Sequence, residues 1–259
     1  MVARFKEIDG ANQGVLVSVQ LFTVVIPLMI LGFSYFRGFA ENASPGTVWI
    51  RELGLSGATS DTVRSAFGDT AALRSIWTVV GVAAFMVWGI PMSMVVASIF
   101  AKAWRREQFG AGQRLLRGSV WFLLYLTMLV LRERLAFGAE YHGATQLLMF
   151  VVALVPVWVF WSLTPLVLVR DGGHGFKYLA LAGLAGVVID GIIVPVIGRV
   201  IFPGVIDAWT SFGPIGVAMA IMTWCGLLGT AWVITACVGA VLWERTAPTD
   251  TVLEAQTAS

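Results

Sequence analysis

The sequence predicts an all-α polytopic membrane protein: six transmembrane helices with kinked spans, and short interfacial helices in the first outer loop. Of its 259 residues, 58% are apolar and 12% are charged, whereas about 25% are charged in a typical soluble domain. The charged residues are clustered, and the gaps between clusters are long enough for spanning helices. The apolar runs also lack the alternation of membrane β-strands. This composition excludes an ordinary soluble enzyme, a disordered chain and a disulfide-rich module.

The spans are defined by five segments without Asp, Glu, Lys or Arg: 10–36, 75–101, 118–131, 141–169 and 208–243. A helix needs roughly 20 apolar residues to cross the hydrocarbon core. The short third segment is extended by Leu115 and Leu116, and Arg117 can reach the headgroups through its aliphatic stem. A sixth apolar stretch carries only Lys177, Asp190 and Arg199. The predicted spans are Gly14–Phe36, Ile76–Ala101, Leu115–Leu131, Gln146–Val169, Phe176–Phe202 and Gly213–Trp243.

The distribution of Lys and Arg predicts the orientation. With both termini in the cytoplasm, ten of these residues lie in inner segments and six in outer segments, as the positive-inside rule favours. We therefore expect a multi-pass protein of the inner membrane. The basic loop 102–117 is the clearest cytoplasmic segment. Its basic residues are predicted to contact anionic lipids: Lys102, Arg105, Arg106, Arg114 and Arg117.

The spans, the loops between them and the N-terminal segment are expected to form one transmembrane domain, residues 1–245. Val2–Ile8 is either a short helix on the inner membrane surface or a frayed terminus. The outer loop 37–74 predicts two short amphipathic helices, one starting at Ser44–Pro45 and one capped by Ser60–Asp61. Residues 246–259 form a polar tail, which we expect to be disordered.

Residues that commonly carry catalysis are scarce. His142 and His174 fall in predicted loops on opposite sides of the membrane. Cys225 and Cys237 are separated by about 18 Å along the last helix, too far for a disulfide, and are expected to be small apolar fillers. No P-loop, HExxH, GxSxG or CxxC motif occurs. We therefore expect no enzymatic activity and no metal or other cofactor.

Asp190 is the candidate functional residue. It lies near the middle of the fifth span, where a charge costs at least ~2.5 kcal/mol. Arg199, nine residues later, is about half a turn away around the helix and about 13.5 Å along it. The intervening Pro195 can kink the helix but cannot easily bring the two together. Asp190 therefore needs a partner from another helix or a water cavity, and it is either functional or a structural hydrogen-bonding group.

Glycines on the same face predict close helix packing. Gly183 and Gly186 lie near Asp190 on the helical wheel, and Gly226 and Gly229 lie on the last span. Small residues let helices approach closely in membranes, so we expect the fifth and sixth spans to pack together; the same residues could instead line a pathway. Kinks are expected at the prolines inside the spans: Pro27, Pro91, Pro156, Pro165 and Pro195.

The order of these parts resembles the YihY/virulence factor BrkB family, formerly labelled ribonuclease BN-like. The resemblance rests on LFTVVIPLMIL, RELGLSGATSDTVRSAFG and SIFAKAWRREQFGAGQRLLRG, and on the closing half from GFKYLALAGLAGVVIDGIIVPVIGRVIF to the final LWER. It covers roughly residues 10–245. It implies six transmembrane helices in the inner membrane and a link to envelope integrity, and it supplies no catalytic residues. The first span departs from the family pattern, because the aromatic and small polar residues usual before its proline are reduced to Gln20, Phe22 and Thr23.

Two classes of function follow from the sequence. The chain either translocates or exports a lipid or other amphiphile through a cavity near Asp190, or it is a non-catalytic scaffold for envelope integrity. The expected partners are membrane lipids, with a second copy of the chain or an envelope protein as further candidates. Nucleic acid is not an expected partner, because the basic loop 102–117 has one acid, Glu107, no histidine, and no metal cluster for RNA hydrolysis.

Overall fold

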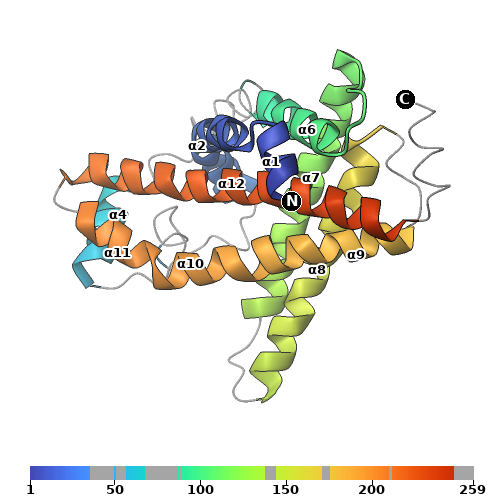
Figure 1. The fold of residues 1–259 in the computed structure, drawn as a ribbon. Coiled ribbons are helices and arrows are strands. Elements are labelled where there is room, and N and C mark those ends of the chain that lie inside the picture. The colour runs from blue at the N-terminus through green and yellow to red at the C-terminus, as the bar shows by residue number, and fades with distance from the viewer. Residues whose placement is uncertain are drawn as a thin grey trace. The chain divides into compact units, whose positions relative to one another are not determined.

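The structure, a computed structural model, describes residues 1–35, 50, 57–67, 87, 89–137, 144–170, 176–209 and 212–247. These residues contain helices and no β-strand (Figure 1), so the predicted all-α class is confirmed. The helices are α1 (Val2–Glu7), α2 (Gly10–Tyr35), α4 (Gly57–Phe67), α6 (Ile90–Ala103), α7 (Ala111–Phe137), α8 (Ala144–Leu168), α9 (Phe176–Gly186), the π-helix η2 (Val187–Ile193), α10 (Val194–Val200), α11 (Phe202–Trp209) and α12 (Pro214–Thr246).

Three helical stretches in the described residues are long and apolar enough to cross a membrane: Leu147–Leu168, Lys177–Val200 and Ile215–Thr246. They correspond to the last three predicted spans. Ile90–Ala103 is a shorter apolar helix and contains the end of the second predicted span. Parts of the prediction lie outside the described residues: most of the outer loop 37–74, the first half of the second span, His142, His174 and the tail from residue 248 onward.

The chain divides into two compact units. One consists of Met1–Gly14, Ser93–Ile193 and Thr230–Ser259, and the other of Val15–Met92 and Val194–Gly229. We call them the first and second units and describe each by itself. In the first unit, α7 packs against α8, and α8 packs against α9 and η2.

Helix α8 carries one buried and one exposed stripe of apolar residues in the first unit. Its buried positions include Val157, Phe160, Trp161 and Leu168, which recur at helical spacing. Large apolar side chains on another stripe are exposed: Leu147, Val151, Val155 and Val159. An exposed apolar stripe is unfavourable in water but matches the acyl chains of a bilayer.

The second unit contains the one predicted outer-loop helix that the structure describes. Helix α4 begins at Gly57, three residues before the predicted cap, and the Ser60 hydroxyl donates to the Gly57 carbonyl at 2.8 Å. Ser60 therefore lies within the first turn instead of capping it. Val63 is buried as expected for the apolar face. Thr59 also donates to Asp207 of α11 at 3.0 Å, which joins α4 to a helix that the sequence did not predict.

Candidate functional site

Asp190 is buried in the first unit, with 4% of its surface exposed. The Trp161 indole N–H, on α8, donates to its Oδ2 at 3.3 Å. The Trp232 indole N–H, on α12, also interacts with this side chain but has no partner in hydrogen-bonding geometry. The guanidinium of Arg132, on α7, attracts the carboxylate without forming an ion pair. Within the described residues Asp190 thus has a hydrogen bond from the neutral Trp161 indole and lies in the field of the Arg132 guanidinium.

Five aromatic side chains form a buried cluster beside Asp190, which we call the aromatic cluster. Its members are Trp121, Tyr125, Phe160, Trp161 and Trp232. The rings of Tyr125 and Trp232 have centroids 5.0 Å apart, and those of Phe160 and Trp161 are 5.1 Å apart. Both pairs meet edge to face, a favourable geometry for aromatic rings. Three helices, α7, α8 and α12, therefore contribute side chains to one buried aromatic core beside the carboxylate.

Two glycines of α9 allow that helix to pack closely against α8 beside this core. A Cβ at Gly186 would lie 2.1 Å from Trp161 Cγ, and one at Gly183 would lie 2.9 Å from the Ser162 backbone nitrogen. Both glycines are thus in contact with α8, whereas the sequence analysis paired them with the last span. Helix α12 approaches α9 at an ordinary distance, 3.9 Å from a Cβ at Gly239 to Ala182. The reason for the difference is that the bulky Trp161 needs the space that the glycines leave.

The other two predicted packing glycines lie on α12. A Cβ at Gly226 would have no atom of the described residues within 4 Å, so none of the described helices approaches that position closely. Gly229 is buried. Small size on a membrane helix therefore does not by itself identify a contact.

The backbone at Asp190 is π-helical from Val187 to Ile193. Pro195 is the second residue of the following α10 and has no N–H to donate to a carbonyl in the preceding turn. A wider turn before a proline relieves the clash between its ring and that turn, and π-helical turns are frequent at functional sites. Arg199 is exposed in the last turn of α10.

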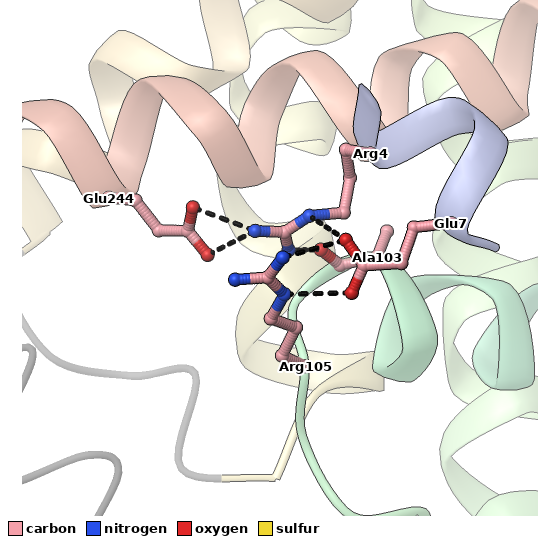
Figure 2. A network of polar contacts seen from close by, with 5 residues as sticks. All are labelled: Arg4, Glu7, Ala103, Arg105 and Glu244. Atoms are coloured by element: carbon pink, nitrogen blue, oxygen red, sulfur yellow. Dashed lines mark hydrogen bonds and ion pairs between the residues drawn. The ribbon is translucent and has the colours of Figure 1, made fainter. Parts of the chain in front are cut away.

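A second polar group, the Arg4 cluster, lies where α1 meets the ends of α6 and α12 in the first unit (Figure 2). Arg4 is 5% exposed and donates to both carboxylate oxygens of Glu244, at 2.8 and 2.9 Å. It also donates to the carbonyl of Ala103, the last residue of α6. Glu7 accepts two hydrogen bonds from Arg105, at 2.9 and 2.7 Å. Val2–Glu7 is therefore a docked helix and not a frayed terminus.

Several basic residues that were predicted to contact lipids bind other residues of the chain instead. Arg105 binds Glu7, and Arg114 donates to Gln108 at 2.7 Å. Arg117 donates to the carbonyl of Val167 at 3.2 Å and lies over the Phe109 ring at 4.2 Å. It therefore caps the C-terminal turn of α8, where a cation is favoured. Lys102 is exposed, and Arg106 is partly exposed.

The Glu7–Arg105 pair predicts a specific acid dependence. The hydrogen bonds from Arg105 hold the pKa of Glu7 below its ordinary value of 4.5. The ionised Glu7 carboxylate therefore stabilises the docked helix fully above pH 4.5. This contribution is lost as the pH falls through the lowered pKa of Glu7. Both side chains are about half exposed, so the effect is expected to be small. A fluorophore on Val2→Cys should report α1 docking, with a difference between wild type and Glu7→Gln that is present at neutral pH and vanishes in acid. A difference that grows on acidification would contradict this prediction.

The sequence identifies Asp190 as a candidate but does not identify the residues around it. Tryptophan is abundant, with 11 residues in the chain, but in an apolar helix nothing distinguishes a core tryptophan from a lipid-facing one. The described residues contain no group of three or more His, Cys, Asp or Glu side chains placed to hold a metal ion. Cys225 and Cys237 are both buried and free.

The part of the chain that the structure describes is all-helical, with three helices of membrane-spanning length and composition and a buried carboxylate. No protein-family model, curated protein or solved structure matches the chain. Nothing in these comparisons identifies the YihY/BrkB family, so that resemblance stays an expectation.

Proposed function

We propose that this chain is an integral inner-membrane protein that translocates or exports a lipid or another amphiphile, with Asp190 at the functional centre. The observation that carries the proposal is a buried carboxylate on a π-helical turn, bonded to a neutral indole N–H. Burying a charge in a membrane is unfavourable at any depth near the midplane. Ionisable groups in such positions often belong to a substrate or ion pathway.

The membrane placement is supported by exposed apolar faces on several helices. On α8 the stripe runs from Leu147 to Val159, and on α9 to α10 it includes Leu184, Val188 and Val196. We infer six spans, both termini in the cytoplasm and a single transmembrane domain of residues 1–245, from the charge distribution. The YihY/BrkB resemblance, with its link to envelope integrity, is part of this proposal.

The aromatic cluster gives the proposed site its physical character. Rings from α7, α8 and α12 surround the region with apolar surface, and the indole N–H groups supply polar contacts. An amphiphile needs both kinds of contact, because its tail is apolar and its headgroup is polar. No catalytic step is part of this proposal.

The test is lipid translocation in proteoliposomes. Wild-type protein should move a fluorescent lipid between leaflets, and Asp190→Asn should reduce the rate to that of empty vesicles while leaving the helical circular-dichroism spectrum unchanged. The matched control is Asp207→Asn, which makes the same change on the exposed surface of α11 and should retain wild-type rates. Full activity in Asp190→Asn would refute the assignment of Asp190.

A second candidate, a non-catalytic envelope scaffold, is favoured by one observation. The interface between α8 and α9 is tight, with Gly183 and Gly186 in direct contact with α8. A scaffold needs a rigid interior and no path through it. Background translocation rates in both wild type and Asp190→Asn would favour this function over transport.

A further inference from the structure

Helix α1 is too short to be stable alone. It has six residues, and an isolated helix shorter than about 12–15 residues is marginal in water. Its existence therefore depends on the contacts that hold it in the first unit. The nature of those contacts determines what can release it.

One apolar contact of α1 is local. The Phe5 ring packs on Gly10, where a Cβ would lie 2.5 Å from the ring, so α1 folds back on the start of α2. Val2 is 62% exposed. By contrast, α1 reaches the ends of α6 and α12 through the hydrogen bonds and ion pairs of the Arg4 cluster (Figure 2). Charged contacts thus join α1 to those two helices.

The backbone around the cluster adopts a conformation that side chains disfavour. Asp9, after α1, has φ 55° and Arg105, after α6, has φ 52°; they are the two residues other than glycine with positive φ among those described. Arg105 occupies the position where glycine usually ends a helix, since Arg106 N–H donates to Ala101 and Arg105 N–H to Lys102. Such positions are retained where they have a role, and here the Arg105 side chain reaches Glu7.

The ends of α6 and α12 also hold each other without α1. Trp104 and Trp243, next to Ala103 and Glu244, are both buried, and their ring centroids lie 5.4 Å apart. Departure of α1 would therefore leave this junction packed. The opening would be local, as expected for a small, separately stable part of a fold.

We propose that α1 is an electrostatic latch, which an anionic lipid surface releases by competing with Glu244 for Arg4 and with Glu7 for Arg105. The docked Arg4 has every guanidinium nitrogen engaged with Glu244, Ala103 or Glu7, so docking and lipid binding exclude each other. Once released, the segment presents Arg4 and Lys6 together with Val2, Phe5 and Ile8 at helical spacing. That combination suits an anionic membrane interface. The inference rests on the proposed function only for the placement of the protein in a membrane.

The test uses the full chain in vesicles, with an environment-sensitive fluorophore on Val2→Cys. The native Cys225 and Cys237 are fully buried, which directs labelling to the new cysteine. In vesicles of phosphatidylcholine alone the label should report water. In an equal mixture with phosphatidylglycerol its emission should shift to the blue, and added salt should reverse the shift. Glu244→Gln should enlarge the shift.

The matched control is Glu107→Gln. It removes an exposed ion pair of 3.0 Å with Arg170 in the same unit and should leave the label unaffected. Emission that is the same in both kinds of vesicle, for wild type and for Glu244→Gln, would overturn the proposal. Loss of the helical circular-dichroism signal in Glu244→Gln would also overturn the proposal, because the Arg4 cluster would then be required for the stability of the whole fold. Asp190→Asn should keep the label response, so failure of the transport proposal can be told apart from failure of the latch.

Discussion

Replacing either Gly183 or Gly186 by alanine should lower the stability of the protein by about 2 kcal/mol or more. The new Cβ at residue 186 would lie 2.1 Å from Trp161 Cγ, near the backbone of α8, where a side-chain rotation cannot relieve the overlap. At residue 183 it would meet the Ser162 backbone nitrogen at 2.9 Å. The helices must then separate, which also displaces Trp161 from Asp190. In detergent, the apparent melting temperature by circular dichroism should fall by about 5–10 °C.

Gly226→Ala is the matched control for these two variants. A Cβ at residue 226 would contact nothing within 4 Å, so only the helix propensity changes. Alanine is favoured over glycine in a helix interior by about 1 kcal/mol. Gly226→Ala should therefore melt at the wild-type temperature or slightly above it. Equal effects at all three positions would show that the contacts with α8 do not determine the stability.

The second large effect is expected for Trp121→Ala. This side chain is fully buried and contacts the rings of Tyr125, Phe160 and Trp232, and its indole N–H donates to Thr164 at 3.1 Å. Its removal leaves a cavity where α7, α8 and α12 meet. Large-to-small changes of buried aromatic residues cost about 3–5 kcal/mol. The same melting assay should detect this loss.

Two further variants separate the causes of the Trp121 effect. Trp121→Phe keeps an aromatic ring but loses the hydrogen bond to Thr164, so its cost should be about 1–3 kcal/mol. Leu123→Ala changes a side chain on the same helix that is 58% exposed and should have little effect. If Leu123→Ala were as destabilising as Trp121→Ala, the aromatic cluster would not be the core of the first unit.

Local patterns were sufficient for the elements that depend on neighbouring residues alone. The all-α class followed from long apolar runs, and the fourth, fifth and sixth predicted spans correspond to helices of spanning length. Helix α4 was predicted from its polar start and apolar Val63, but its first residue is Gly57, because Ser60 bonds within the first turn. Helix α11 was missed, since its apolar residues were counted with the preceding span and the following loop.

The candidate site could be predicted only in part. Asp190 stood out because a charge in an apolar span has few stable surroundings. Its partner Trp161 could not be predicted, since a tryptophan in an apolar helix is equally compatible with core and lipid. The docking of α1 could not be predicted from the sequence either, because Arg4 and Glu244 are separated by 240 residues in the chain.

The sequence by itself determined the helical class, the last three apolar spans and the carboxylate within one of them, because these depend on composition and on spacing along one helix. Only the tertiary structure decided that Gly183 and Gly186 contact α8, that the Trp161 indole binds Asp190 and that Arg4 joins three helices. The physical reason is that apolar side chains are nearly interchangeable in a membrane environment. Which of them meet depends on shape complementarity between helices, and that property belongs to the packed assembly.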